Sequence, residues 1–372
     1  MEKIRIGVIG AGNMGKTHAR TIKNIPDAYL AGLCDVNVAQ VTRVAAELDC
    51  EAFTDHKQFI DKNRLDGILI AAPHFFHPEL AIYAFNHGVH VLCEKPIAVH
   101  VKQTQSMLEA HQRSGLRFGM MYQMRLDPVF RKVHEIVSAG LLGPIRRTNW
   151  IITNWFRTQA YFNAGNWRGT WNGEGGGLLM SQCPHQFDLF QWICGMPIKV
   201  RGFCHFGQSH QIEVEDEVAA YFDYDNGATG AFFSSTGEAP GIDRLEIVGD
   251  QGKIILEDGI LTYKHNLVSC AEFIRTATKG LDIPPCETIP VDIGERGDQY
   301  VWWRGVIENF VAAIRDPAVP LVCPGDEGVK STMLSNAILL SSIEEKTVML
   351  PLDADAMAEC MSRLIAGSYR HR

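Results

Sequence analysis

The sequence lacks long apolar runs, an excess of basic residues and paired cysteines. No run approaches the roughly 18 apolar residues that a membrane span needs. Lys and Arg number 35 against 43 Asp and Glu, a net charge of −8 that repels nucleic acid and anionic lipid. The ten cysteines contain no CxxC pair, so we expect reduced core residues rather than disulfides or a zinc site.

The N-terminal segment breaks into glycines too early for a signal peptide. We therefore expect a cytoplasmic protein that binds neither nucleic acid nor a membrane. A length of 372 residues with 46% hydrophobic residues predicts two domains with sizeable cores.

Short β-branched apolar runs alternate with helical patterns up to about residue 120. Because parallel strands need a crossover connection, this alternation predicts a doubly wound parallel sheet, an α/β domain over residues 1–122. The expected strands are Ile4–Ile9, Tyr29–Cys34, Gly67–Ala72, Val89–Cys93 and Phe118–Met121, and the expected helices are Met14–Asn24, Val38–Leu48, Pro78–His87 and Val101–His111.

The remainder, residues 123–372, shows longer alternating runs with turn signals such as Asn226-Gly227 and Asp258-Gly259. These features predict an α+β domain with a large, mostly antiparallel open sheet. Further helices are expected at Gln182–Ile193, Trp302–Ile314 and Gly325–Ser342. With no repeat, low-complexity tract or flexible linker, we expect two closely packed domains.

A glycine motif follows the first expected strand. Gly10, Gly12 and Gly15 form GxGxxG at the start of a helix, where they permit a tight turn, backbone approach to a pyrophosphate, and close helix packing. Asp35 lies 20 residues beyond Gly15 at the end of the second strand, in position to accept hydrogen bonds from ribose hydroxyls. No arginine follows Asp35, so the pattern favours NAD over NADP.

Seven stretches of sequence, in this order and spacing, resemble the Gfo/Idh/MocA oxidoreductases, the family of glucose-fructose oxidoreductase and inositol dehydrogenase. They are GVIGAGNMG, AAPHFFHPELA, CEKPIAV, YQMRLDP, NWRGTW, GEGGGLL and CPHQFDLFQW. The resemblance implies an NAD-binding Rossmann domain followed by an open-sheet substrate domain, with nicotinamide and substrate meeting in a cleft. It also implies a homo-oligomer, a dimer or tetramer.

The segment Glu94-Lys95-Pro96 matches the EKP motif of that family, whose lysine lies beside the nicotinamide and the reacting hydroxyl. It follows a parallel strand, at the sheet edge where ligands bind. A half-buried lysine there would lose its proton more easily and would stabilise an alkoxide. The alternative is a solvated lysine paired with Glu94.

His185 matches the catalytic histidine of the family. Imidazole suits the task of taking the hydroxyl proton while hydride leaves; the alternative is a hydrogen-bonded core histidine. Many relatives carry aspartate where this sequence has Ser181, so we expect a Lys95–His185 pair rather than a trio. Asp188 would either orient the imidazole ring or serve a structural role.

An aromatic cluster surrounds Trp167-Arg168, which matches the WR motif that touches cofactor and substrate in the family. Trp150, Trp155, Trp167 and Trp171 fall within 22 residues, and flat aromatic faces suit sugar rings. The alternative is an ordinary sheet-edge core. The predicted substrate-binding residues are Lys95, Tyr122, Arg125, Trp155, Tyr161, Arg168 and His185.

By the same resemblance, the loop after the third strand contacts the cofactor, which argues against a metal site at His74 and His77. The full predicted cofactor set is Gly10, Gly12, Asn13, Met14, Gly15, Asp35, Pro73, His77, Glu94, Lys95, Gln123, Trp167 and Arg168. For Tyr122, Gln123 and Arg125 the alternative is an interdomain hinge.

The sequence therefore predicts an NAD-dependent oxidoreductase that moves hydride between nicotinamide and a secondary hydroxyl, or the matching ketone, of a sugar, glycoside or cyclitol. One alternative is an NAD-dependent glycosidase that oxidises the sugar transiently and eliminates the aglycone. Another is a non-catalytic NAD(H)-binding regulator, which would not need the proton-transfer residues Lys95 and His185.

Overall fold

The computed structural model describes residues 2–165 and 167–367. Its contacts divide the chain into two compact units. The first comprises Met1–Leu126, Gly173–Gly175 and Gly297–Thr332, and the second comprises the rest of the chain.

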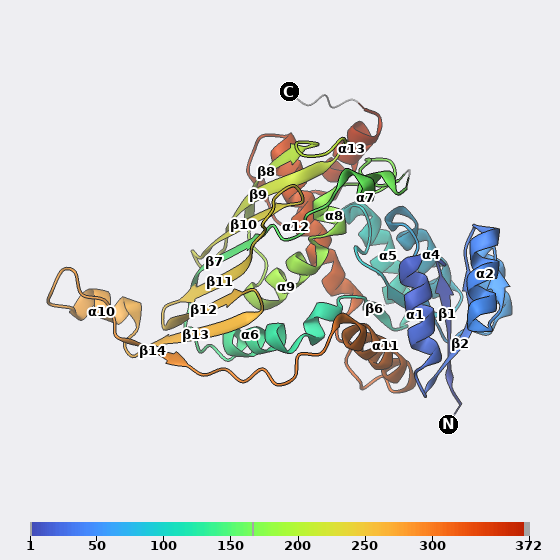
Figure 1. Cartoon of the computed structure of the whole chain (residues 1–372), viewed down its shortest axis with the longest axis horizontal. Helices are drawn as coiled ribbons and strands as arrows, with labels where there is room; N and C mark the ends of the chain where they lie inside the picture. The colour runs from blue at the N-terminus through green and yellow to red at the C-terminus, as the bar shows by residue number, and fades with distance from the viewer. Residues whose placement is uncertain (1, 166, 368–372) are drawn as a thin grey trace. The chain divides into compact units, whose positions relative to one another are not determined.

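The first unit is built on a six-stranded parallel sheet with the order β3-β2-β1-β4-β5-β6 (Figure 1). The strands are β1 (Ile4–Ile9), β2 (Ala28–Cys34), β3 (Ala52–Phe53), β4 (Gly67–Ile70), β5 (His90–Cys93) and β6 (Phe118–Met120). Strands β4 and β5 are buried almost throughout, as expected where helices cover both faces of a parallel sheet.

Helices cover both faces of this sheet. Helices α1 (Asn13–Lys23), α2 (Val38–Leu48) and α11 (Gln299–Arg315) share one hydrophobic core, whereas α3 (His56–Lys62), α4 (His77–Asn86) and α5 (Val101–Ser114) share the other. Two short 3-10 turns, η1 (His74–Phe76) and η2 (Gln123–Leu126), follow strand ends. The doubly wound prediction is confirmed.

The strand register aligns the ends of the strands. Cys34, Ile9, Ile70, Cys93 and Met120 pair across β2, β1, β4, β5 and β6. Because the strands are parallel, the residues that follow each of these positions leave from one edge of the sheet. This carboxyl edge is where doubly wound sheets bind ligands.

The second unit contains a nine-stranded sheet with the order β14-β13-β12-β11-β7-β10-β9-β8-β15. All neighbours are antiparallel except β7 and β10. The strands are β7 (Ile145–Ile152), β8 (Lys199–Phe206), β9 (Glu215–Asp223), β10 (Thr229–Ser235), β11 (Asp243–Gly249), β12 (Gly252–Glu257), β13 (Ile260–Asn266), β14 (Cys286–Ile289) and β15 (Val348–Met349). The predicted open sheet is confirmed.

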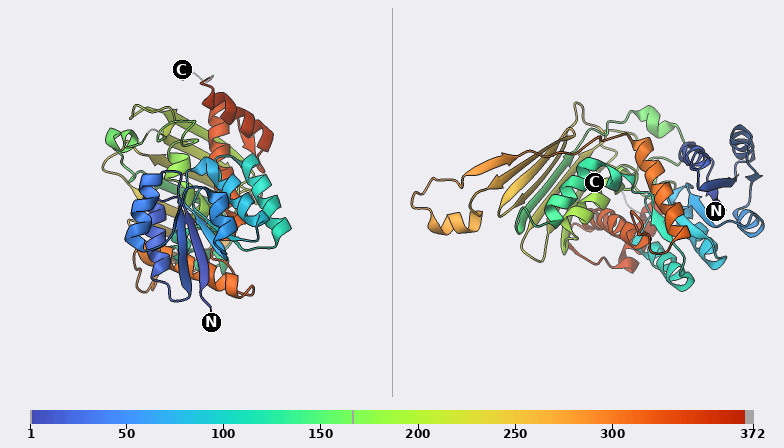
Figure 2. Two further views of the ribbon diagram at one scale, coloured as in Figure 1. Left: turned by 90° about the vertical axis from the view of Figure 1, so that its right-hand side faces the viewer. Right: turned by 90° about the horizontal axis from the view of Figure 1, so that it is seen from below.

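Several helices of this unit lie on one face of the sheet (Figures 1 and 2). The helices of the unit are α6 (Pro128–Ser138), α7 (Gln159–Asn163), α8 (Leu178–Ser181), α9 (Pro184–Cys194), α10 (Cys270–Thr276), α13 (Ala354–Ile365) and, from Met333 onward, α12 (Gly325–Ile343). Helices α6 and α9 lie against the sheet, whereas α10 extends beyond its β14 edge, and no helix of the described chain covers the opposite face over β8–β12.

Two features differ from the sequence prediction. The sequence analysis did not predict β3 or the helices α3, α6, α7, α8, α10 and α13. Strand β3 has two residues and α3, α7, α8 and α10 have four to seven, lengths too short for periodicity to identify, whereas α6 and α13 have 11 and 12 residues and were missed despite their length. Residues 297–332 pack with the first unit, although the single boundary at residue 122 placed them in the second. Helix α11 returns because Trp303, Val306, Ile307 and Phe310 complete the core on α1.

Candidate active site

The glycine turn after β1 fits a bound pyrophosphate. Gly10 has φ of +101° and a Cβ there would lie 2.4 Å from the Ala71 carbonyl, while a Cβ at Gly15 would lie 1.7 Å from the Gly10 carbonyl. Both glycines are therefore required by the protein's own packing. A Cβ at Gly12 would meet nothing within 4 Å, so its missing side chain leaves open space in front of the turn.

Gly12 is also the N-cap of α1 and makes no side-chain cap, and the first turn of α1 carries no acidic residue. The backbone amides of Asn13 and Met14 open the helix and have no partners within it. Such a helix end is an anion site. The residues present fit NAD, because the open space at Gly12 and the uncapped amides of Asn13 and Met14 would hold its phosphates.

Asp35 stands at the same edge, directly after β2. Its Oδ2 accepts from the backbone N–H of Ala11 (2.7 Å) and its Oδ1 from that of Asn37 (2.8 Å). The carboxylate thus ties the glycine turn to the start of α2, and each oxygen keeps a lone pair with which it can accept from a ribose hydroxyl.

The loop after β4 contains Pro73 and His77. His77 is fully buried, and its Nδ1 and Nε2 each lie 2.8 Å from a carbonyl oxygen, those of Pro96 and Ala72. Burial lowers the pKa of His77, although both carbonyls favour the charged ring. The His77 ring therefore connects the segment after β4, through Ala72, to the segment after β5, through Pro96. The predicted contact of this ring with the cofactor remains a prediction.

His74, in the same loop, lies with Nδ1 3.3 Å from the Glu174 carbonyl. Burial, together with the neighbouring charges of His77 and Lys95, lowers its pKa to about 3. The imidazole is therefore neutral at pH 7. No group of three or more potential metal ligands occurs in the described parts of the chain.

Glu94 and Lys95 follow β5. Glu94 is 8% exposed; its Oε1 lies 2.7 Å from His18 Nε2 and its Oε2 accepts from the backbone N–H of Lys95 (3.0 Å). Burial raises the pKa of Glu94, but the hydrogen bond from His18, together with the electrostatic influence of His18 and Lys95, outweighs it and holds the pKa at about 2. A half-buried Lys95 therefore adjoins an ionised carboxylate.

The residues after β6 are more buried than the sequence suggests. Tyr122 is fully buried within a hydrophobic core, and Arg125 is 5% exposed with its guanidinium 3.3 Å from Glu327 of α12. With its amide oriented to satisfy both neighbours, Gln123 accepts from Trp303 Nε1 (3.1 Å) and donates to the Met121 carbonyl (3.0 Å). Their predicted ligand contacts remain predictions.

In the second unit, Arg168 is held between aromatic rings. Its guanidinium lies 4.5 Å from the Tyr161 ring centroid and 4.4 Å from that of Trp167, and it donates to the Tyr161 hydroxyl (2.6 Å). Trp155 lies 5.6 Å from the Arg157 guanidinium, which also stacks on Tyr161. These contacts link Trp155, Tyr161, Trp167 and Arg168 through Arg157, and their predicted ligand contacts remain predictions. Asn166, the first residue of the NWRGTW stretch, lies outside the described residues.

A polar chain leads from this cluster to α8. Gln182 Nε2 donates to the Tyr161 hydroxyl (3.3 Å), and Ser181 Oγ donates to Gln182 Oε1 (2.6 Å). The Ser181 hydroxyl also lies 2.8 Å from the Gly177 carbonyl, so Ser181 adjoins both the glycine-rich segment and the polar chain that reaches Tyr161. His185 is half-buried in the first turn of α9, whereas Asp188 is buried on the same helix with Gln191 as a neighbour at 3.5 Å.

The glycine-rich segment before α8 packs closely against the backbone of β9. A Cβ at Gly177 would lie 1.9 Å from the Glu215 carbonyl, and the Glu215 carboxylate accepts from the backbone N–H groups of Gly177 (2.8 Å) and Leu179 (3.0 Å). Glu215 thereby caps the turn that leads to His185. The sequence analysis did not identify this residue.

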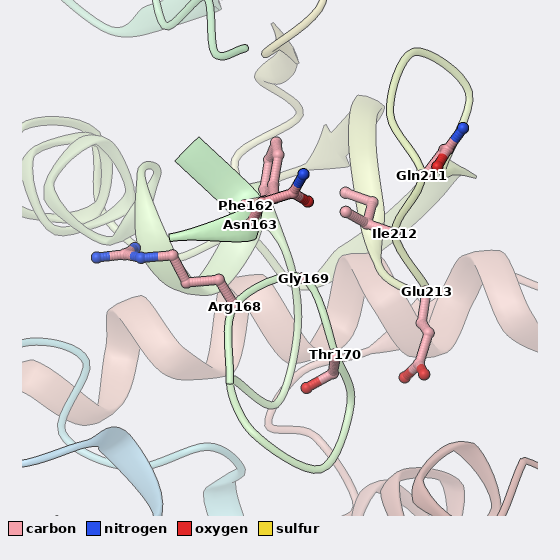
Figure 3. Close-up of a pocket in the computed structure, with 8 residues that line it drawn as sticks. All are labelled: Phe162, Asn163, Arg168, Gly169, Thr170, Gln211, Ile212 and Glu213. Atoms are coloured by element: carbon pink, nitrogen blue, oxygen red, sulfur yellow. The ribbon is translucent and has the colours of Figure 1, made fainter. Parts of the chain in front are cut away.

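A pocket of about 420 Å³ lies beside Arg168 (Figure 3). The end of α7 and residues 168–170 form one wall, and the β8–β9 turn forms the other. The lining residues are Phe162, Asn163, Arg168, Gly169, Thr170, Gln211, Ile212 and Glu213. Glu213 connects the two walls by two hydrogen bonds. Its N–H donates to the Gly169 carbonyl, and its carboxylate accepts from the Trp171 N–H. Neutral amides, a hydroxyl and a carboxylate suit a polyhydroxylated ligand.

Sequence reasoning missed His18 and Gln182 as well as Glu215. A signal existed for His18, which lies on the buried face of α1 with Gly15, Ala19 and Ile22. A histidine on an apolar helix face needs a polar partner. No local pattern marks Gln182, because its partner Tyr161 is distant in sequence.

Two family models match the chain. Residues 4–122 match the oxidoreductase family with an NAD-binding Rossmann fold, and residues 130–255 match the GFO/IDH/MocA C-terminal domain. Together they cover well over half of the chain. The chain belongs to the Gfo/Idh/MocA family. It is an NAD-dependent oxidoreductase.

Relatives and solved structures agree with this assignment. Myo-inositol 2-dehydrogenase of Thermotoga maritima is 24% identical over 93% of this chain and 98% of its own length. A 2,7-anhydro-N-acetylneuraminate hydratase of Mediterraneibacter gnavus is 26% identical over 54% of this chain and 52% of its own. The WlbA dehydrogenase of Bordetella pertussis, solved with NADH and UDP-GlcNAcA, shares the fold with a TM-score of 0.80 at 24% identity, over 95% of this chain and all of that one.

Helices of membrane-spanning length and apolarity are not found in the described residues.

Proposed function

We propose that this oxidoreductase transfers hydride between the nicotinamide of NAD and a secondary hydroxyl, or the matching ketone, of a sugar, glycoside or cyclitol. In this proposal residues 1–122 bind the cofactor and the remainder of the chain supplies the substrate-binding groups. We further propose that the protein acts in the cytoplasm.

The observation that carries this proposal is the alignment at the carboxyl edge of the parallel sheet. The register places the ends of β2, β1 and β5 in one row. Asp35, the open glycine turn and Lys95 follow directly. The groups that would bind ribose, pyrophosphate and the reacting oxygen therefore leave from one edge, in the order in which a dinucleotide would lie along it.

The chain would supply binding and proton transfer, while bound NAD accepts the hydride. Lys95 would hold the carbinol oxygen and stabilise its developing charge. His185 would take the hydroxyl proton. Arg168, fixed by Tyr161, would donate to further hydroxyls, and the half-buried faces of Trp155 and Trp167 would contact the CH faces of the ring.

A screen of sugars, glycosides and inositols tests this proposal by change in NADH absorbance, with protein stripped of bound cofactor. Turnover of a secondary alcohol in this set, lost on heating, is the expected result. An absence of turnover with every such compound in both directions would contradict the proposal.

The hydratase relative favours a second candidate, a redox-neutral reaction in which oxidation is transient and the cofactor is restored. The first step would be shared, so the cofactor edge and Lys95 do not separate the two reactions. A redox-neutral route needs further acid and base groups to remove the proton beside the new ketone and to assist the leaving group. Buried Glu174 and Asp188 and the half-buried Tyr161 are candidates, but no residue pattern in the chain requires further acid and base partners.

We expect net dehydrogenation. With a nitrophenyl glycoside and substoichiometric NAD, nitrophenol release should stop at or below about one equivalent per cofactor, because each oxidation consumes one NAD. The assay measures nitrophenol and NADH absorbance together. Release of many nitrophenols per NAD, with solvent deuterium incorporated beside the oxidised carbon, would instead establish the redox-neutral reaction.

We also propose that the protein is a homo-oligomer, a dimer or tetramer. The uncovered face of the large sheet carries Phe203 and Tyr221, which are 53% and 46% exposed. Phe203 pairs across the sheet with Ala219, and Ala219 pairs with Phe233, so an apolar row crosses three strands. Exposed apolar patches of this kind mark interfaces. Sedimentation velocity should show an oligomer for the native chain and a shift toward monomer for Tyr221→Asp, and a monomeric native chain would contradict the proposal.

A further inference from the structure

His18 and Glu94 form a buried polar pair in the first unit. His18 is 0% exposed, and its Nε2 lies 2.7 Å from Glu94 Oε1. His18 lies on α1, the helix whose N-terminus forms the glycine turn, whereas Glu94 precedes Lys95. The pair therefore connects the proposed pyrophosphate-binding helix to the segment that carries the proposed reactive lysine.

The surroundings of His18 fix its role as a donor. Its ring contacts Trp303 of α11 edge-on at 5.9 Å, and Nδ1 has no hydrogen-bond partner in the described residues. A proton on Nδ1 would be buried without an acceptor, which is costly. The favoured tautomer therefore carries its proton on Nε2 and donates it to Glu94.

Glu94 transmits this contact to Lys95. Its second oxygen accepts from the backbone N–H of Lys95 (3.0 Å), and its own N–H donates to the Ile70 carbonyl of β4 (2.9 Å). One carboxylate thus binds a helix on one side and the backbone of Lys95 on the other. Rotation of this carboxylate would release the Lys95 backbone.

We propose that His18 is a positioning residue: by donating to Glu94 it keeps that carboxylate ionised and aligned on the backbone of Lys95, and so holds Lys95 in its reactive orientation. The reactivity assigned to Lys95 rests on the proposed function. The contacts that place His18 behind Lys95 do not depend on it.

Among the titratable groups around Glu94, His18 contributes most to keeping the carboxylate ionised. They are His74 and His77 from the loop after β4, Cys93 at the end of β5, and Lys95 itself. Burial lowers the pKa of both histidines and raises that of the Cys93 thiol, so all three are neutral at pH 7. Helix α11 contributes only the uncharged indole of Trp303 to this contact.

The expected effect of removing the donor follows from the sign of each influence. Burial raises the pKa of Glu94, and the His18 hydrogen bond is the largest influence that lowers it to about 2. Without that bond the carboxylate takes up a proton at a higher pH. His18 supplies the two largest influences that lower this pKa, so its loss leaves burial opposed only by Lys95 and raises the pKa of Glu94 toward the weakly acidic range, where the neutral form becomes populated.

The experiment compares His18→Leu, which removes the donor, with His18→Gln, whose amide replaces Nε2–H. In the enzyme with NAD and the substrate found by the screen, the acid limb of kcat/KM should lie about one pH unit higher in His18→Leu than in the native enzyme, and should return toward its native position in His18→Gln. A merely structural histidine would lower activity evenly across pH in both variants. KM for NAD should change less than kcat, because the pyrophosphate turn is retained.

A second measurement needs no substrate. Acetylation of Lys95 by an amine-reactive reagent is followed between pH 5 and 9 by mass spectrometry, with exposed Lys62 as an internal reference. A neutral Glu94 favours the reactive free amine, so Lys95 should label about threefold or more faster below pH 7 in His18→Leu than in the native protein or His18→Gln. Glu94→Gln, which cannot ionise, should reproduce the fast labelling and serves if His18→Leu does not fold.

The two measurements separate the two proposals. The positioning role would be overturned if His18→Leu showed both an unshifted acid limb and unchanged labelling of Lys95. If His18→Leu does not fold, unchanged labelling of Lys95 in Glu94→Gln would overturn it. A native enzyme that labels as expected but turns over no alcohol would contradict the proposed function and leave the positioning role supported.

Discussion

Replacing Lys95 or His185 by alanine is expected to lower kcat by about a hundredfold or more while NADH still binds. Both residues are proposed to interact more strongly with the transition state than with the bound substrate, so the loss should appear in kcat rather than in cofactor affinity. Lys95 leaves the sheet edge at which Gly12 and Asp35 are proposed to bind the cofactor, and neither replacement alters Gly12 or Asp35.

Single-turnover hydride transfer, followed by nicotinamide absorbance, separates the chemical step from product release. NADH fluorescence gives the dissociation constant of NADH for each variant. The matched control is Lys62→Ala, which replaces an exposed lysine on α3. Hydride transfer at the native rate across the pH range in His185→Ala would show that Lys95 alone takes the proton. Hydride transfer at the native rate in Lys95→Ala would show that Lys95 does not take part in the chemical step.

The second large effect is expected at Asp35, whose carboxylate should favour NAD over NADP about tenfold to a thousandfold. Two like charges in close, poorly screened contact cost on the order of 1 to 4 kcal/mol, and the extra phosphate of NADP would lie against this carboxylate. Asp35→Ser should narrow the ratio of the two dissociation constants, chiefly by improving the binding of NADP.

Asp35 also accepts hydrogen bonds from the Ala11 and Asn37 amides, so Asp35→Ser alters the turn as well as the charge. Asp35→Asn is the matched control, because its amide oxygen retains one acceptor at the same position. Narrowed selectivity in both variants assigns the effect to charge. Equal affinities of the native protein for NAD and NADP would disprove the role of Asp35.

Local sequence patterns were sufficient to predict the parallel sheet and the glycine turn. The β-branched runs, the GxGxxG spacing and Asp35 act through contacts with near neighbours in the chain, and the structure places them as expected. The open antiparallel sheet was predictable for the same reason, since hairpin turns such as Asn226-Gly227 join adjacent strands.

Only the tertiary structure revealed contacts between distant parts of the sequence. His18 meets Glu94 across 76 positions, Gln182 meets Tyr161 across 21, and α11 returns to the first unit from residue 299 onward. Periodicity predicts that a face is buried but not which side chain it will meet. The sequence by itself determined the family and the glycine turn, and it predicted Lys95 and His185 as the reactive pair. The contacts of Glu94 behind Lys95 were decided by packing, because a buried charge must find its partner wherever the fold places one.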